Sequence, residues 1–552
     1  MEEVRELLHA ATKAACGEIT DIELTRPDEQ FGDYATNVAL QLSKKLGKNP
    51  RELAEKIIAG LPKDSAIAQA DIAGPGFINI MLSDAALIRA MARKPSQSLK
   101  DKSVVAEYSD PNPFKVLHAG HLYTSVVGDA IANLLEQAGA DVHRVNFGGD
   151  VGLHVGKTMW AILKELGGEH PEKLTDIENE KRSEWMAAAY VEGTNAYEDD
   201  ETAQQEIISL NKRVYQLHTD NDHKSPFAQI YWTTRSWSYE YFDEFYDSIG
   251  TKFEKYYPES EAAELGLETV KAHLKDGVFE ESEGAVIFKG EPYGLHTRVF
   301  INREGLPTYE AKDVGLIFTK KKDYNFDRSV VITGNEQEQY MAVVLKAIEQ
   351  FAPELTKATS HITHGMVKLK GGVKMSSRKG NILRAVDVLH YAAEAARKIN
   401  ETEDQRTVLG AVKYAFLKQR TGGDIIYDPE ESVSVEGNSG PYLQYTHARA
   451  RSILRKVEHN NAPLTSLDDN ERSLARKLGE YTEVVDKSVN ELMPHLIATY
   501  LYELAQTFNR FYEKTKVLGS DRETERLQLV YEYAETLKSG LTILNIPAPE
   551  KM

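Results

Sequence analysis

Residues 103–121 read Ser-Val-Val-Ala-Glu-Tyr-Ser-Asp-Pro-Asn-Pro-Phe-Lys-Val-Leu-His-Ala-Gly-His. The apolar run at 103–107 predicts a buried strand, residues 109–117 predict a loop, and the histidines open a helix that continues through Val126 and Ile131. A strand, a loop and a helix in this order begin a nucleotide-binding α/β unit. In such units ligands bind beyond the carboxyl ends of the strands, so the stretch predicts a site near residue 118.

The two histidines suit a polyphosphate ligand. His118 and His121 are three positions apart, so on the first turn of a helix they share one face. Gly120 lies between them and lets a ligand approach the backbone closely. A helix N-terminus that carries two imidazoles is a favourable place for phosphate groups. Taken alone, such a pair often arises by chance, and two ordinary helix histidines are the more common explanation.

A second segment, residues 374–381, reads Lys-Met-Ser-Ser-Arg-Lys-Gly-Asn. Its cationic and hydroxyl side chains suit a loop that grips phosphates, although a solvated basic loop is the usual explanation of such a charge run. The residues predicted to bind ATP here are Lys374, Met375, Ser376, Ser377 and Lys379. Together the two segments indicate nucleotidyl transfer from ATP.

The order of the two segments, about 250 residues apart, resembles the signatures of class I aminoacyl-tRNA synthetases. Ser377 stands where that pattern has its last lysine, and Lys115 stands just before the first signature. A lysine before the first signature in place of the last lysine of the second is typical of arginyl-tRNA synthetases. Further similarity to bacterial-type arginyl-tRNA synthetases covers residues 31–37, 74–79, 440–449 and 548–552.

The resemblance implies a multidomain α/β protein. A small α+β N-terminal domain at 1–97 would contact tRNA, and a Rossmann-like class I synthetase catalytic domain would span 98–398. The catalytic domain would contain an insertion at about 160–290 and the second signature loop at 370–384. An all-α anticodon-binding domain would occupy 399–552.

Several local elements are expected from the residue pattern. Helices are predicted at 34–46 and 51–60, and polar helices at 178–217 within the insertion. Strands are predicted at 78–82, 142–147 and 329–334, and again at 286–288 and 299–301 after the insertion.

The implied reaction attaches arginine to tRNA(Arg) in two steps. Arginine first attacks ATP to form arginyl-adenylate and pyrophosphate, and the aminoacyl group then moves to the terminal adenosine of the tRNA. Such chemistry needs positioning and charge stabilisation, which we assign to His118, His121, Lys115 and Lys374 as catalytic residues. Gly120 is added as an ATP-binding residue, and Mg²⁺ is expected to bridge phosphate oxygens of ATP.

Arginine selection calls for carboxylates, because a guanidinium pairs with a carboxylate in a planar, bidentate way. The resemblance places the arginine-binding residues at Glu107, Asp110, Asn112, Tyr309, Asp313 and Gln337. Asp110 replaces a serine that is more usual in the family. Without the resemblance, any of the 85 acidic residues would be read as a solvated surface carboxylate.

Anticodon recognition is implied for Tyr442, Tyr445 and Arg449, which are spaced for one helical face. Aromatic rings that stack on unpaired bases, with an arginine nearby, are common in single-stranded RNA recognition. A helix packed into a bundle is the alternative, and it is preferred for most other aromatic residues of this half.

Bulk composition limits the possible classes. The 552 residues carry one cysteine, which excludes an intramolecular disulfide and a multi-cysteine zinc site and is compatible with a reducing cytosol. No apolar run reaches membrane-spanning length, so a cytoplasmic protein without membrane attachment is expected, most simply a monomer. A net charge of −19 argues against nucleic-acid binding, but 368–384 and 447–456 contain only basic charges.

Three other functions remain open from the sequence. They are a synthetase for another amino acid, a stand-alone nucleotidylyltransferase that makes a small adenylate, and a non-catalytic tRNA-binding relative. The spacing of His361 and His364 offers no third metal ligand, so both are expected to be structural.

Overall fold

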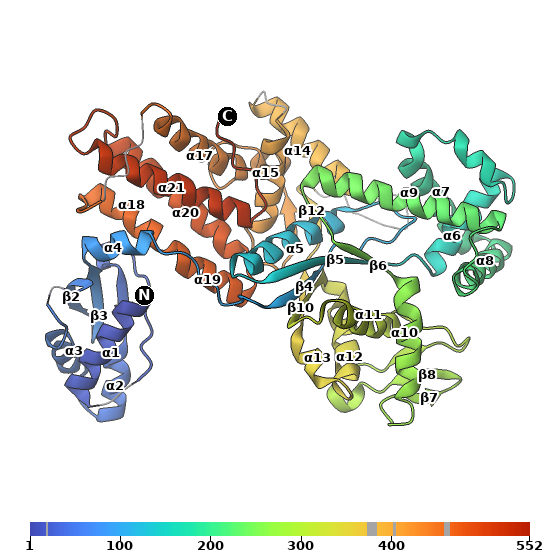
Figure 1. Cartoon of the computed structure of the whole chain (residues 1–552), viewed down its shortest axis with the longest axis horizontal. Coiled ribbons are helices and arrows are strands. Elements are labelled where there is room, and N and C mark those ends of the chain that lie inside the picture. Colours follow the sequence, from blue (N-terminus) through green and yellow to red (C-terminus); the bar gives the residue numbers. More distant parts are fainter. Residues whose placement is uncertain (18–19, 64, 372–382, 401–403, 458–463) are drawn as a thin grey trace.

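A computed structural model describes residues 1–17, 20–63, 65–371, 383–400, 404–457 and 464–552. Figure 1 shows a central sheet with helices on its faces, a small N-terminal unit at one end and a helical C-terminal part beside that unit. Among the described residues, the largest hydrophobic core joins the central sheet to the C-terminal helices, and the N-terminal unit has a core of its own. No helix in these ranges is both long and apolar enough to span a membrane.

The N-terminal unit packs helices on three antiparallel strands in the order β1-β3-β2. Its elements are α1 (Glu2–Cys16), β1 (Tyr34–Thr36), α2 (Val38–Leu46), α3 (Pro50–Ala59), β2 (Ile67–Ala73), β3 (Phe77–Leu82) and α4 (Asp84–Met91). The predictions of β3 and α3 are confirmed. The helix predicted at 34–46 is wrong at its start, because buried Tyr34, Ala35 and Thr36 pair with β3 as a strand and the helix begins at Val38.

The catalytic part is built on five parallel strands in the order β11-β10-β4-β5-β6. These are β4 (Ser103–Glu107), β5 (Asp141–Gly148), β6 (Lys255–Pro258), β10 (Arg328–Gly334) and β11 (Thr359–His364). The strands predicted at 103–107, 142–147 and 329–334 are therefore confirmed. Helices α5 (Ala119–Gln137), α11 (Tyr309–Tyr324), α12 (Glu338–Glu349) and α13 (Pro353–Ala358) accompany the sheet.

The segment between β5 and α11 holds mainly helices, as predicted. They are α6 (Leu153–Leu166), α7 (Arg182–Asp199), α8 (Glu201–Thr219), α9 (Pro226–Ile249) and α10 (Glu259–Ala272). However, β6 lies within this segment and pairs with β5, so the range 160–290 is not wholly separate from the central sheet. The sequence of β6, Lys-Tyr-Tyr-Pro, is too short and polar to mark a buried strand.

The strands predicted at 286–288 and 299–301 are confirmed, but they belong to a second sheet. It is antiparallel, in the order β7 (Glu280–Ser282), β8 (Ala285–Phe288) and β9 (Arg298–Ile301). This small sheet lies beside α10, away from the C-terminal helices (Figure 1).

The C-terminal part is almost entirely helical. Its elements are β12 (Val367–Leu369), α14 (Ala385–Asn400), α15 (Gln405–Leu417), β13 (Ile425–Tyr427), α16 (Pro429–Ser432), α17 (Gly440–Leu454), α18 (Asp469–Gly479), α19 (Tyr481–Glu491), α20 (His495–Lys514) and α21 (Glu523–Ile543). The predicted boundary between residues 398 and 399 falls inside α14.

Ion pairs fix the N-terminal unit to α18 and α19. Arg472 of α18 contacts Asp33 at 2.7 Å and Asp84 at 3.0 Å, and Arg26 contacts Glu483 of α19 at 3.0 Å. Asp33 also accepts a hydrogen bond from the Leu82 N–H at 2.7 Å. The segment 31–37, which was recognised by resemblance, therefore supplies one side of a contact between the two ends of the chain.

Candidate active site

Three segments that carry predicted site residues end or begin at the carboxyl edge of the central sheet. Glu107 is the last residue of β4, and the loop from Tyr108 to Leu117 carries the chain from there into α5. Gly148 ends β5, and Gly334 ends β10 just before the turn that contains Gln337. Because parallel strands end on the same side, one edge brings together segments that are far apart in sequence.

His118 and His121 lie together at the N-terminus of α5. The backbone N–H of Gly120 donates to Nδ1 of His118 at 3.1 Å, and the N–H of His118 donates to Nδ1 of His121 at 3.1 Å. This arrangement is a capping box built from two histidines, and the rings stack with their centroids 3.8 Å apart. Since both Nδ1 atoms accept hydrogen bonds, each neutral ring carries its proton on Nε2, where it can be donated to a ligand.

Both imidazoles are held in the neutral form. Desolvation and, to a smaller extent, the positive charge of Lys115 lower the pKa of His118 to about 4. Burial lowers the pKa of His121 well below its usual range, and the neighbouring His118 and Lys115 contribute in the same direction. At neutral pH the pair therefore offers two N–H donors without carrying a positive charge of its own.

We expect this pair to make folding sensitive to acid. A histidine whose folded pKa is depressed must be neutral in the folded state while the unfolded chain binds a proton. Stability is therefore lost as the pH falls from about 6.5 toward 4. His118→Asn removes this ionisable group, so the variant should lose less stability over that interval. Urea unfolding at several pH values measures it, and identical pH profiles for both proteins would contradict it.

Residues 383–385, which follow the second signature segment in the sequence, lie beside the first signature. The N–H of Ala119 donates to the carbonyl of Leu383 at 2.8 Å, and the N–H of Ala385 donates to the carbonyl of Leu117 at 2.9 Å. At the other end, the N–H of Lys370 donates to the carbonyl of Tyr427 at 2.9 Å. Lys374, Met375, Ser376, Ser377 and Lys379 themselves lie outside the described residues. Of the described residues next to them, Leu383 and Ala385 bond to the start of α5, and Lys370 bonds to Tyr427.

Lys115 lies at the entrance to α5. Its Nζ is 5.0 Å from the centre of the Tyr190 ring, which belongs to α7. Its charge also lowers the pKa of both histidines.

Two of the predicted arginine-binding carboxylates already have partners inside the chain. Lys320, which is fully buried on α11, donates to Glu107. The hydroxyl of Tyr340 on α12 donates to Asp313. These contacts orient both carboxylates at the end of the sheet, and the Lys320 ammonium offsets the charge of Glu107.

Asp110 and Asn112 lie in the loop after β4. Asp110 accepts a hydrogen bond from the N–H of Phe147 at 2.8 Å, and the side-chain oxygen of Asn112 accepts from the N–H of Gly149 at 2.8 Å. Ser109 and Asp110 have φ angles of 73° and 47°, a left-handed backbone that serine and aspartate adopt only under local constraint. The loop is thus fastened to the end of β5.

The carboxylates repel one another. Desolvation raises the pKa of Asp110 well above its usual range, and the charge of Glu107 raises it further. Burial raises the pKa of Asp313 to about 7, and the charges of Glu107 and Glu259 act in the same direction. The raised pKa values favour protonated Asp110 and Asp313 while no cation is near, and a bound guanidinium would favour their ionised forms.

Tyr309 and Gln337 lie at the rim. The Tyr309 side chain is 55% exposed at the start of α11, and Lys312 lies 5.1 Å from the centre of its ring. Gln337 is exposed in the turn after β10. Tyr309 and Asp313 share a helix as expected, but Asp313 points to Tyr340 while Tyr309 faces solvent.

Sequence reasoning missed three groups that shape this pocket. They are Lys320 beside Glu107, Tyr340 beside Asp313, and the buried pair of Lys312 and Glu259, whose atoms are 2.6 Å apart. Lys320 lies two helical turns after Asp313, so its position on the same face was a usable signal. Nothing in the sequence indicated Tyr340, which comes from another helix.

The predicted anticodon-binding residues form one network on α17. The side chain of Arg449 donates to Asn509 of α20 at 2.9 Å, and Asn509 donates to the Tyr442 hydroxyl at 2.8 Å. The guanidinium carbon of Arg449 is 4.8 Å from the centre of the Tyr445 ring and 5.8 Å from that of Tyr512.

Exposure separates these side chains into supporting and accessible groups. Tyr445 is 42% exposed and Tyr512 is 41% exposed, whereas Tyr442 and Arg449 are half-buried. Two exposed rings that flank an arginine make a surface suited to unpaired bases. Tyr512 was not predicted, because its stretch was assigned to the helical core.

We expect Tyr445→Ala to weaken tRNA binding. Base stacking on an aromatic ring is worth about 1–3 kcal/mol, so the Kd for tRNA should rise by about 5–150-fold. A binding titration with tRNA(Arg) measures it, and Tyr391→Ala is the control because Tyr391 is 39% exposed on α14, outside this network. Equal affinities for both variants would contradict the assignment of this surface.

Two other features bear on possible ligands. Among the described residues, no group of three or more His, Cys, Asp or Glu side chains could hold a metal ion. His364 contacts Thr124 of α5 at 2.6 Å and His361 contacts Thr333 at 2.8 Å, so both join neighbouring elements.

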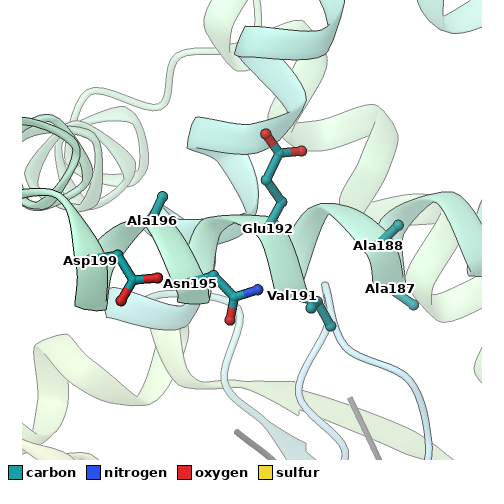
Figure 2. Close-up of a pocket in the computed structure, with 7 residues that line it drawn as sticks. All are labelled: Ala187, Ala188, Val191, Glu192, Asn195, Ala196 and Asp199. Carbon is teal, nitrogen blue, oxygen red and sulfur yellow. The ribbon is translucent and has the colours of Figure 1, made fainter. Parts of the chain in front are cut away.

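An open hollow on α7 is lined by small and acidic side chains, and none of the predicted site residues belongs to it (Figure 2).

Comparisons with known proteins cover nearly the whole chain. Residues 84–427 match the family model for class I (R) tRNA synthetases, catalytic domain. Residues 2–82 match the model of the arginyl tRNA synthetase N terminal domain, and residues 443–552 match that of the DALR anticodon binding domain.

Individual relatives agree with these models. The chain is 29% identical to the arginine–tRNA ligase of Flavobacterium psychrophilum, with 100% of both chains covered. It is 31% identical to that of Haemophilus influenzae, with 95% of this chain and 94% of the relative covered. The solved Thermus thermophilus arginyl-tRNA synthetase superposes with a TM-score of 0.82, at 26% identity and 100% coverage of both chains. The chain belongs to the class I arginyl-tRNA synthetase family.

Proposed function

We propose that the protein is an arginine–tRNA ligase that uses ATP to charge tRNA(Arg) for translation. The observation that carries the proposal is the presence at one sheet edge of two neutral imidazole donors and a cluster of buried carboxylates. The donors suit the phosphates of ATP, and the carboxylates suit the guanidinium of arginine.

In the first step, a carboxylate oxygen of arginine attacks the α-phosphorus of ATP. The bond to the leaving pyrophosphate breaks, and arginyl-adenylate forms. Negative charge builds up on the phosphate oxygens, and the Nε2–H groups of His118 and His121 are placed to donate to them. Lys115 adds positive charge at the same helix end, and we propose that Lys374, Ser376, Ser377 and Lys379 approach from the adjacent segment.

In the second step, a ribose hydroxyl of the terminal adenosine attacks the aminoacyl carbonyl carbon, and AMP leaves. The chain positions the two substrates rather than forming a covalent intermediate with either. Mg²⁺ would enter with ATP, held by phosphate oxygens and water, and would neutralise part of the phosphate charge.

For the pocket, we propose that Asp313 and Asp110 bind the guanidinium directly. Glu107, with its charge offset by Lys320, supports them, while Tyr309 covers the side chain from the rim and Asn112 and Gln337 contact the rest of the amino acid. A substrate without a guanidinium would leave the carboxylates unpaired, which can reduce its use by about 10⁴-fold or more.

For the tRNA, we propose that Tyr442, Tyr445 and Arg449 of α17 bind the anticodon and that residues 1–97 contact the body of the molecule. We also propose that residues 98–398 form the catalytic domain and residues 399–552 the anticodon-binding domain. We further propose that the protein acts as a monomer in the cytoplasm.

A charging assay tests the proposal. Purified protein, ATP, Mg²⁺, total tRNA and labelled amino acids should give labelled tRNA with arginine and not with lysine or citrulline. Labelling with another amino acid, or none with any, would contradict it.

A further inference from the structure

The segment 545–550, here called the C-terminal strap, runs from the end of α21 along α17. Gln444 donates to the carbonyl of Pro547 at 2.8 Å, His447 donates to the carbonyl of Pro549 at 2.9 Å, and Arg455 donates to the carbonyl of Glu550 at 2.7 Å. Figure 1 shows the C-terminus close to α17. Gln444 and His447 are fully buried on the helix that exposes Tyr445. One end of the strap is therefore fixed to the helix proposed to bind the anticodon.

The other end of the strap is fixed to the catalytic part. The side-chain N–H of Asn545 donates to Asp129 of α5 at 2.9 Å and to the carbonyl of Gly250 at 3.1 Å. Lys413 of α15 donates to the carbonyl of Asn545 at 2.8 Å and to that of Ile249 at 2.6 Å. Lys413 is 3% exposed, so these bonds are protected from water.

Asp129 links these hydrogen bonds to the loop after β4. Its second carboxylate oxygen accepts from the hydroxyl of Tyr108 at 2.7 Å, and both residues are buried. Tyr108 is followed directly by Ser109 and Asp110, whose left-handed backbone shapes the pocket. The α5 backbone at Gly128 packs directly against the Tyr108 ring, because a Cβ atom there would lie 2.2 Å from the ring. Direct contacts therefore join Asn545, Asp129 and Tyr108, which lies two residues before Asp110, and Thr251 also donates to Asp129.

The strap is also stiff. Pro547 and Pro549 have fixed φ angles and cannot absorb a displacement by rotating about that bond. Asn545 has a φ of 52°, a conformation that asparagine tolerates better than most residues. The residue thus meets a backbone requirement and supplies the side-chain N–H, and these two roles can be separated by mutation.

We propose that Asn545 is a positioning residue for the arginine pocket, and that the C-terminal strap couples the pocket to the tRNA-binding helix α17 through Asp129 and Tyr108. The proposal rests on the function proposed above. Movement of α17 when tRNA binds would be transmitted along the strap to the loop of Asp110.

Asn545→Gly tests the coupling, since glycine keeps the left-handed backbone and removes only the side chain. We expect the KM for arginine to rise or kcat to fall by about 3–30-fold at saturating tRNA, with the KM for tRNA unchanged. The matched control is Asn133→Ala, which removes two hydrogen bonds from α5 to the carbonyls of Thr542 and Ile543 at 3.2 and 3.1 Å, and a third that Asn133 accepts from Arg144 at 2.7 Å. It lies off the route to Tyr108 and should keep both kinetic constants. Thermal unfolding of both variants records the loss of stability.

A double-mutant cycle with Tyr445→Ala examines the link to α17. If the strap transmits the effect of tRNA, the double variant should lose less kcat at saturating tRNA than the product of the fold-losses of the two single variants. Wild-type kinetics in Asn545→Gly, equal kinetic losses in Asn133→Ala, or losses that multiply fully in the double variant would each overturn the coupling. A wild-type protein that forms no arginyl-tRNA would instead contradict the proposed function, and the coupling with it.

Discussion

Asp313→Asn should lower kcat/KM for arginine by about 10²–10³-fold, because losing one partner of a buried charge pair costs about 2–5 kcal/mol. The substitution keeps the shape of the side chain and an oxygen that can accept from the Tyr340 hydroxyl. Steady-state charging with varied arginine measures the effect. The matched control is Asp323→Asn, at the exposed end of the same helix, which should retain wild-type kcat/KM.

The same substitution should not destabilise the fold. Burial raises the pKa of Asp313 to about 7, so in the absence of arginine the folded protein keeps a proton that the unfolded chain releases above about pH 4. This raised pKa makes wild-type stability fall as the pH rises from about 4 to 7, a loss that Asp313→Asn removes. A variant that is inactive and also less stable at pH 7.5 would contradict the pocket assignment, since misfolding would then explain the inactivity.

His118→Asn should lower kcat for arginyl-adenylate formation by about 10²–10³-fold, the usual effect of removing one donor to a developing charge. Asparagine is itself a good N-cap, so its side-chain oxygen can still accept from the backbone at the start of α5. Stability should therefore change little, by less than about 1 kcal/mol. Single-turnover formation of adenylate, followed together with urea unfolding, separates the two effects.

His118→Ala provides the comparison, because it removes the donor and the cap together. It should match His118→Asn in rate and be less stable by about 1 kcal/mol. If His118→Asn turned over at the wild-type rate, the imidazole would be a helix cap only, and the proposed contact with the phosphates would be wrong.

The sequence predicted much of the fold because strong local signals were present. The apolar run 103–107 and the histidines after it were sufficient to place β4, the loop and α5. Weak signals failed where tertiary pairing decides the structure. Residues 34–36 were assigned to a helix but pair with β3, and β6 joins the central sheet with only four residues, Lys-Tyr-Tyr-Pro.

Individual site residues could be predicted only at positions that match the family's motifs. That resemblance pointed to Glu107 and Asp313, but the partners that orient them, Lys320 and Tyr340, come from contacts between separate elements. The histidine pair was expected to face phosphate from one helix face. The structure adds the capping bonds that leave each proton on Nε2, which no spacing rule predicts.

ATP–pyrophosphate exchange with each of the twenty amino acids, with and without total tRNA, tests the central claim most directly. The account predicts exchange with arginine alone, because only its guanidinium satisfies the carboxylates of Asp110 and Asp313. Exchange with a different amino acid would overturn the pocket while leaving the chemistry of the histidine pair in place. If no amino acid supported exchange even with tRNA present, both the arginine assignment and the proposed ATP chemistry would be contradicted.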